Sequence, residues 1–179
     1  KDVTLIARGK HLEAIRKNGL TIQKLWDESR ETLPVKACTA EEYKEIPDVI
    51  LVCVKGYSMD ETVPTIKKIA GKETVVIPIL NIYGTGGRLQ KKLPELTVTD
   101  GCIYVSANIM EPGVILQHGK ILRVVFGARK PEEETEKMRE VAKDMVTDDL
   151  EVILSENIRR DAMVKFSYVS PIGAAGLYC

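Results

Sequence analysis

Four side chains in this sequence could bind a charged ligand or move a proton: Arg8, Lys55, Asn81 and Lys165. The planar guanidinium of an arginine makes two charge-assisted hydrogen bonds to one phosphate. A lysine ammonium attracts a phosphate or a carboxylate, and an asparagine amide both donates and accepts hydrogen bonds. A lysine in a cleft can also act as a general acid when its pKa is lowered.

Arg8 belongs to the turn Ala7-Arg8-Gly9-Lys10-His11, which directly follows the apolar residues 3–7. In a dinucleotide-binding fold, the end of the second strand faces the adenine ribose. An acidic residue there binds the 2′-hydroxyl of NAD, whereas an arginine suits the 2′-phosphate of NADP. A solvated basic turn is the alternative interpretation, and spacing alone favours it.

Lys55 and Asn81 each follow an apolar segment, residues 49–54 and 75–80. Ligands of open α/β sheets bind in the crevice beyond the carboxyl ends of the strands, which is where both side chains would lie. A lysine that merely extends from a strand end to solvent explains Lys55 equally well. The glycines after Asn81 match neither G-x-G-x-x-G nor a P-loop, so a flexible turn into a helix is favoured there.

Lys165 lies in a helical segment where Met163, Phe166 and Val169 could form an apolar face. In a cleft beside such a face, the ammonium could donate a proton to a reacting oxygen. A solvated lysine on the helix surface is the alternative, and it is favoured when only the sequence is considered.

Histidine and cysteine positions give no sign of a metal or disulfide site. His11 and His118 lack the spacing of metal ligands, so we expect turn or surface roles for both. The four cysteines are far apart and form no C-x-x-C pair, and Cys53 lies inside the strongest apolar run, where a buried free thiol is expected. This cysteine usage suits the reducing cytoplasm.

Apolar runs that alternate with amphipathic segments position these side chains and predict an α/β sheet with right-handed crossovers. Residues 23–32 are expected to form a loop, and residues 114–117 and 121–126 a hairpin that turns at 118–120. Pro131 suits a first helical turn, and Pro171 should kink or break the last helix. Strands are expected at 3–7, 20–22, 33–38, 49–54, 75–80, 98–105, 114–117, 121–126 and 150–154; helices are expected over the stretch ending at 18–19 and at 58–69, 85–93, 131–147 and from 156 past 165.

Composition excludes several classes of protein. The 26 lysines and arginines balance 26 aspartates and glutamates, and this neutrality argues against a nucleic-acid partner. No apolar run approaches the roughly 20 residues that span a bilayer, so no membrane partner is expected. The first residues resemble neither a signal peptide nor a transit peptide.

Taken together and in this order, the segments resemble the ketopantoate reductase (2-dehydropantoate 2-reductase) family. Residues 3–11 resemble its second strand and NADP-selecting turn, and residues 49–57 resemble the strand that ends in its active-site lysine. Leu80-Asn81 resembles the start of its Asn-Gly loop. Residues 103–113 and 123–127 resemble its later strands.

The resemblance implies that NADPH reduces ketopantoate to pantoate, a step of pantothenate and coenzyme A biosynthesis, or reduces a related 2-oxo acid. It implies that Arg8 binds the NADP 2′-phosphate and that Lys55 and Asn81 hold cofactor and substrate. Lys165 then protonates the developing alkoxide, so Lys165 and Asn81 are the catalytic candidates. The implied partner is a small 2-oxo acid, and the implied compartment is the cytoplasm.

The chain also departs from the family pattern. No glycine-rich turn precedes residue 3, Ile82 replaces the glycine after the asparagine, and Val169 and Gly173 stand where the family has two asparagines. We therefore expect an incomplete Rossmann-like dinucleotide-binding domain, residues 1–154, followed by the first helix of an all-α domain, residues 155–179. Exposure of the strand at residue 3 would favour a homo-oligomer.

Two other functions stay open from the sequence. The missing asparagines are compatible with a non-catalytic relative that binds a nucleotide or metabolite without turnover. A purely structural or interaction domain is the third hypothesis, and neutral charge and an exposed sheet edge are its only support.

Overall fold

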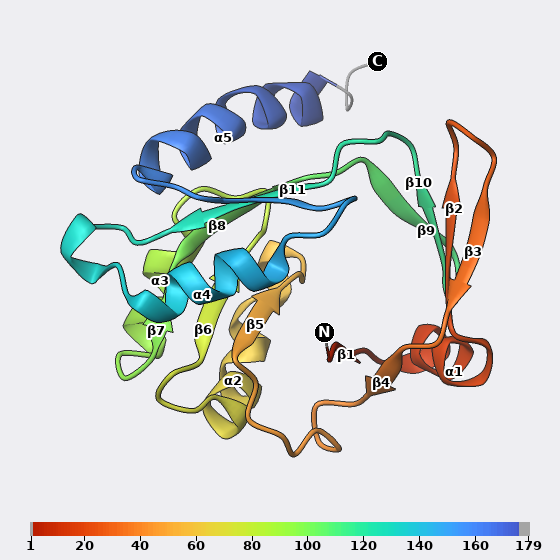
Figure 1. Cartoon of the computed structure of the whole chain (residues 1–179), viewed down its shortest axis with the longest axis horizontal. Coiled ribbons are helices and arrows are strands. Elements are labelled where there is room, and N and C mark those ends of the chain that lie inside the picture. Colours follow the sequence, from red (N-terminus) through yellow and green to blue (C-terminus); the bar gives the residue numbers. More distant parts are fainter. Residues whose placement is uncertain (1, 176–179) are drawn as a thin grey trace. The chain divides into compact units, whose positions relative to one another are not determined.

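Parallel strand pairs and the helices that connect them organise the chain, as the alternation of segments predicts (Figure 1). The computed structural model describes residues 2–175. These residues form two compact units, one of Lys1–Glu45 with Tyr104–Ile121 and one of Ile46–Ile103 with Leu122–Cys179. These units are compact groups of residues and do not test where one domain ends and the next begins, so the domain boundary at residue 155 stays a prediction.

The first unit begins with a strand and a helix, and this first strand pairs in parallel with the fourth strand of the chain. Strand β1 (Thr4–Ile6) pairs with β4 (Lys36–Cys38), with Ile6 opposite Cys38. Helix α1 (Gly9–Asn18) lies between them in sequence, and it buries Leu12 and Ile15. Among the described residues, β1 pairs with β4 alone, and Ile6 is exposed. The free edge of β1 has no strand partner among the described residues, as expected from the sequence. Self-association of the protein through this edge stays a prediction.

A second sheet in this unit corrects two expectations. Its order is β3-β2-β10-β9, with β2 at Leu20–Lys24 and β3 at Arg30–Leu33, so the loop expected at residues 23–32 is wrong at both ends. The hairpin expected to turn at residues 118–120 is also wrong. Strand β10 (Val114–Gln117) pairs with β9 (Ala107–Glu111), because Gly113, at φ +82°, makes the turn before it.

The second unit holds two three-stranded sheets. Strands β5 (Val49–Val52), β6 (Val75–Pro78) and β7 (Thr97–Val98) are parallel. The other sheet has the order β12-β11-β8, from Glu151–Leu154, Arg123–Gly127 and Asp100–Tyr104. Between β7 and β8, the Thr99 amide donates to the Val76 carbonyl at 3.0 Å, so one extended segment continues from the first sheet to the second.

Strand β6 is buried on both faces because helices cover each of them. Val76 packs with α2 (Val63–Ile69) and α3 (Thr85–Lys92), whereas Val75 and Ile77 pack with β11 and with α4 (Glu136–Met145). Successive side chains of a strand point to opposite faces, so an uninterrupted apolar run is what such a central strand requires.

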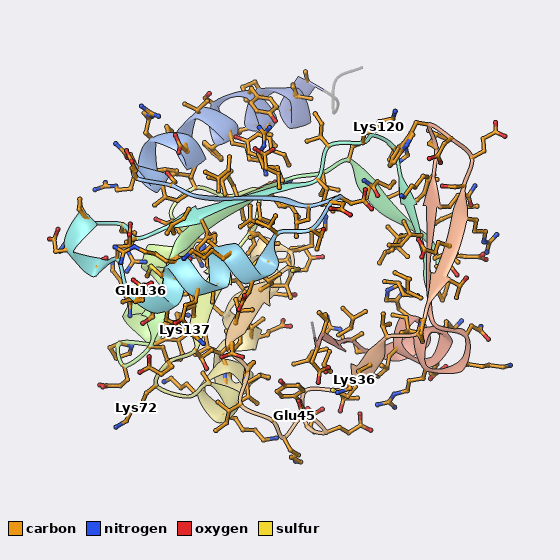
Figure 2. All side chains as sticks on the ribbon, viewed as in Figure 1. Lys36, Glu45, Lys72, Lys120, Glu136 and Lys137 are labelled. Atoms are coloured by element: carbon orange, nitrogen blue, oxygen red, sulfur yellow. The ribbon has the colours of Figure 1, made fainter. Side chains whose placement is uncertain are left out.

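Two helix starts differ from the sequence-based expectation. Helix α4 begins at Glu136, not at Pro131, because the Thr135 hydroxyl accepts the Met138 amide and caps the helix there. Pro131–Glu133 forms only a 3₁₀ turn. Figure 2 labels Lys137 of α4, whose Nζ lies 2.7 Å from Asp48 Oδ1, just before β5. The helix expected from residue 58 begins as 3₁₀ turns and becomes α-helical at Val63.

The last helix, α5 (Ile158–Ala175), packs against β11 (Figure 1). The Ser155 hydroxyl accepts the Asn157 amide and donates to Asp161, which fixes the helix start close to residue 156, where the helix is expected to begin. Helix α5 continues past Pro171, so of the expected kink or break the break is wrong. The proline costs the helix little stability here, because it removes a single backbone amide donor and this part of α5 is exposed to solvent.

Cys53 is exposed, so the expectation of a buried thiol is wrong. Strand β5 pairs only with β6 among the described residues, and its other edge is uncovered. Cys38, Cys53 and Cys102 are free thiols; Cys179 lies outside the described residues. No helix within residues 2–175 is long and apolar enough to cross a membrane.

Gly86 allows α3 to approach the segment between β7 and β8. A Cβ on Gly86 would lie 2.0 Å from the Thr99 carbonyl oxygen and 2.4 Å from Asp100 Oδ1. We expect Gly86→Ala to lower the free energy of unfolding by about 2 kcal/mol, because backbone must move to relieve the overlap. Gly87→Ala is the matched control, since its Cβ would meet no atom within 4 Å. Denaturant unfolding that gives equal stabilities for the two variants would contradict this explanation.

Candidate active site

Lys165 on α5 is a buried lysine, with 5% of its surface exposed. Its Nζ donates a hydrogen bond of 2.6 Å to Asn81 Oδ1 and a second to the Ile103 carbonyl oxygen. The structure thus brings together two of the candidates from the sequence, 84 residues apart in the chain. The alternative of a solvated surface lysine is wrong.

Each partner comes from a different element of the second unit. Asn81 follows β6 at the carboxyl edge of the parallel sheet, and Ile103 lies in β8. Helix α5 presents Lys165 toward both. Ladder hydrogen bonds hold β6 and the Ser155 cap holds the start of α5, so Lys165 and Ile103 lie on regular elements and Asn81 lies in the loop just after one.

A small hollow of about 10 Å³ lies beside the ammonium, which is about the room that one water needs. Phe166 and Tyr83 contribute rings to it, 6.4 Å apart between centroids. Met163, expected on the apolar face, is instead 43% exposed. The lining residues are Leu80, Asn81, Ile82, Tyr83, Gly101, Cys102, Ala162, Lys165, Phe166 and Val169.

Burial lowers the pKa of Lys165 below the usual 10.5 of a lysine, because desolvation penalises the charged form. The neighbouring Cys102 acts in the opposite direction and more weakly. A lysine with a lowered pKa gives up its proton more readily, which is the property that a general acid near neutral pH needs.

This pKa shift predicts a pH dependence of stability. Between the lowered pKa of folded Lys165 and 10.5, the unfolded chain binds a proton that the folded chain lacks, so the free energy of unfolding rises with pH across that window. We expect Lys165→Met to abolish this rise. Lys143→Met, at an exposed site on α4, should keep it. Denaturant unfolding of the three proteins at several alkaline pH values tests this, and parallel curves would contradict it.

Lys55 is exposed at the start of the 3₁₀ turn Gly56–Ser58, beyond the end of β5. A Cβ on the neighbouring Gly56 would lie 2.1 Å from Ile82 Cδ1, so this turn and the loop after Asn81 touch. The structure therefore places Lys55 near the loop that carries Asn81, without a hydrogen bond between the two side chains in the described part of the chain.

Arg8 belongs to the other unit and is described by itself. It is exposed, its backbone is extended, and it directly precedes α1. The first turn of α1 holds no acidic residue, and a Cβ on Gly9 would meet no atom within 4 Å. Arg8 and the N-terminus of α1 thus form an open, electropositive surface.

The sequence profile of the family Ketopantoate reductase PanE/ApbA matches residues 1–131. The chain belongs to this family. The α/β architecture is accordingly the Rossmann-like fold of ketopantoate reductases, as the resemblance implied.

Relatives of the ketopantoate reductase family cover nearly all of this chain. A 2-dehydropantoate 2-reductase of Pyrococcus horikoshii is 32% identical over 97% of the chain and 56% of its own length. The "Uncharacterized oxidoreductase YkpB" of Bacillus subtilis is 27% identical over 94% of the chain and 54% of its own length. The crystal structure of 2-dehydropantoate 2-reductase from Porphyromonas gingivalis W83 superposes with a TM-score of 0.86, at 30% identity, over 99% of the chain and 61% of that structure.

The chain spans little more than half the length of these curated relatives.

The glycine-rich segment after Asn81 has a structural role. Gly84, at φ +75°, precedes α3, and the Gly86 amide donates to the buried Asp100 carboxylate at 2.8 Å. A carboxylate already occupies this helix N-terminus, so a phosphate would meet like charge there. The flexible turn that the sequence favours is thus, in the structure, a capped helix start.

Some contributors to the site carry no signal in the sequence. The Ile103 carbonyl accepts from Lys165 through its backbone, which any residue type provides. Tyr83 and Cys102 also line the hollow, and neither is among the candidate site residues from the sequence. His11 serves as an acceptor for the Gly113 amide at 3.0 Å, which matches the turn role expected for it. Within residues 2–175, no cluster of three acidic, histidine or cysteine side chains could hold a metal.

Proposed function

We propose that this protein is an NADPH-dependent reductase of 2-oxo acids, with ketopantoate as the default substrate and pantoate as the product. Such a reaction belongs to pantothenate and coenzyme A biosynthesis. The observation that carries the proposal is the buried ammonium of Lys165, bonded to Asn81 and open to a hollow, in a chain of the ketopantoate reductase family.

The chemistry of the reaction matches these groups. Reduction adds a hydride to the ketone carbon, and negative charge develops on the ketone oxygen. The Lys165 ammonium stabilises that charge and then transfers its proton to the oxygen, which completes the alcohol. Asn81 fixes the ammonium through its Oδ1, and its amide nitrogen is left to donate to the substrate.

Arg8 suits the 2′-phosphate of NADP. It stands at an exposed helix N-terminus without acidic neighbours in the first turn, where both the guanidinium and the helix dipole favour an anion. Lys55, exposed beyond the end of β5, is suited to a second anionic group of cofactor or substrate. Bound NADPH would supply the hydride.

We infer a cytoplasmic enzyme that acts on a small 2-oxo acid, alone or as a homo-oligomer. The three free thiols among the described residues are typical of a reducing compartment.

Turnover of NADPH with ketopantoate, measured on the complete gene product, tests the proposal. Oxidation of NADPH that depends on ketopantoate and yields pantoate is the expected result. Tight binding of NADPH without turnover of any 2-oxo acid would instead identify a non-catalytic relative.

A further inference from the structure

The two acceptors of the Lys165 ammonium lie on separate elements, so the site requires a contact that fixes their separation. Asn81 Oδ1 belongs to the loop after β6, and the Ile103 carbonyl oxygen belongs to β8. The ammonium can donate to both oxygens at once only while the loop and the strand keep their places. A side chain that joins the loop to β8 would therefore control the geometry around the ammonium.

Asp100, the first residue of β8, makes such a connection. Its side-chain Oδ1 accepts the backbone amide of Gly86 at 2.8 Å, and Asp100 is buried, with 7% of its surface exposed. Gly86 lies in the first turn of α3, and the loop that starts at Asn81 runs directly into this turn. The carboxylate thus attaches the far end of the Asn81 loop to the strand that carries Ile103.

The contact between α3 and β8 leaves little room for adjustment. A Cβ on Gly86 would lie 2.4 Å from Asp100 Oδ1 and 2.0 Å from the Thr99 carbonyl oxygen. A Cβ on Gly101 would lie 2.9 Å from the Pro78 carbonyl oxygen, so the start of β8 is also packed closely against the end of β6. A larger side chain at position 100 would therefore push α3 away, and a smaller one would leave the Gly86 amide without its acceptor.

We propose that Asp100 is a positioning residue of this site, whose carboxylate holds Asn81 where it can accept from Lys165. The inference rests on the proposed function and deepens it. Burial and Cys102 are the causes that shift the pKa of Lys165, so Asp100 acts on the site through geometry. An uncharged oxygen at the same place would accept the same hydrogen bond.

Three substitutions at this position separate geometry from charge, with kcat measured on the complete gene product with NADPH and ketopantoate. Asp100→Asn removes the charge and keeps an oxygen that can accept the Gly86 amide, so kcat should stay within about threefold of the wild type. Asp100→Ala removes the acceptor, and Asp100→Glu keeps the charge but adds one methylene group. Both should lower kcat about 10-fold, because a small misplacement of a catalytic group is costly.

The pH profile distinguishes positioning from a general loss of folded protein. The hydrogen bond to Asn81 favours the charged form of Lys165, so displacement of Asn81 lowers the pKa of Lys165 further. The alkaline decline of the rate should therefore move to lower pH in Asp100→Ala and Asp100→Glu, and it should not move in Asp100→Asn. A smaller folded fraction would scale the rate at every pH without moving the decline.

Thr74→Val is the matched control, at a buried position just before β6 and thus at the opposite end of this strand from Asn81. The Thr74 hydroxyl accepts the Gly71 amide at 2.9 Å and donates to the Pro47 carbonyl oxygen at 2.6 Å. Its removal should lower stability, as in Asp100→Ala, because a buried amide again loses its acceptor. The wild-type kcat and pH profile should remain.

The outcomes separate this inference from the proposed function. Wild-type kcat and pH profile in Asp100→Glu and Asp100→Ala, or an equal loss in Asp100→Asn, would show that Asp100 does not position Asn81, while turnover by the wild type would uphold the reductase. Failure of the wild type to reduce ketopantoate or any other 2-oxo acid would overturn both. Should Asp100→Ala fail to fold, Asp100→Asn and Asp100→Glu give the same comparison.

Discussion

Replacing Lys165 by alanine is expected to lower kcat/KM for 2-oxo acid reduction by about 10²- to 10⁴-fold, the range that a positioned general acid contributes. The loss should fall on kcat more than on KM, because the ammonium meets its largest opposing charge only as the alkoxide forms. Steady-state kinetics of the complete gene product with NADPH provide the measurement. A variant within about threefold of the wild type would contradict the assignment.

Two further readouts separate proton transfer from a structural role. The wild-type rate should fall as pH rises through the lowered pKa of Lys165, since only the ammonium can donate, and the alanine variant should lack that decline. A small alkylamine in the buffer should partly restore the rate of Lys165→Ala by placing an ammonium in the vacated space. Lys143→Ala, at an exposed position of α4, is the control and should keep the wild-type rate and pH profile.

The features of this site that could be predicted from the sequence are those that depend on residues close together in the chain. The apolar run at residues 75–80 indicates a central strand, and Asn81 directly after it must then lie at the carboxyl edge of the sheet. Ser155 marks the start of α5, and the helical period places Lys165 beside Phe166 and Val169. These local signals agree with the fold, so they are sufficient to place Asn81 at the sheet edge and Lys165 on its helix.

Partners distant in sequence could not be predicted in the same way. The pairing of β10 with β2 and β9, rather than with the segment at residues 121–126, depends on which strands meet across the fold. Two helix-start signals compete at residues 131–136, and the threonine cap wins over the proline. The Ile103 carbonyl contacts Lys165 from 62 residues away and is invisible in any side-chain pattern.

Replacing Arg8 by alanine is expected to weaken NADPH binding on the order of 100-fold while changing NADH binding little. Two charge-assisted hydrogen bonds to the 2′-phosphate, at about 1.5 kcal/mol each, account for that difference. NADH lacks this phosphate. The change in its Kd on Arg8→Ala therefore reports any effect of Arg8 on folding or on binding of the rest of the cofactor. Calorimetric titration of each cofactor into the complete gene product gives the two Kd values.

The neighbouring Lys10 provides the matched control. It is exposed in the same first turn of α1, but it carries a point charge without the planar fork of an arginine. Lys10→Ala should therefore weaken NADPH binding only a few-fold, and added salt should erase most of that effect. Equal losses for NADPH and NADH in Arg8→Ala would assign Arg8 to the structure of the turn. An unchanged preference for NADPH in Arg8→Ala would show that another residue binds the 2′-phosphate, because without Arg8 the helix start keeps only a point charge at Lys10, the helix dipole and the backbone amides to hold an anion.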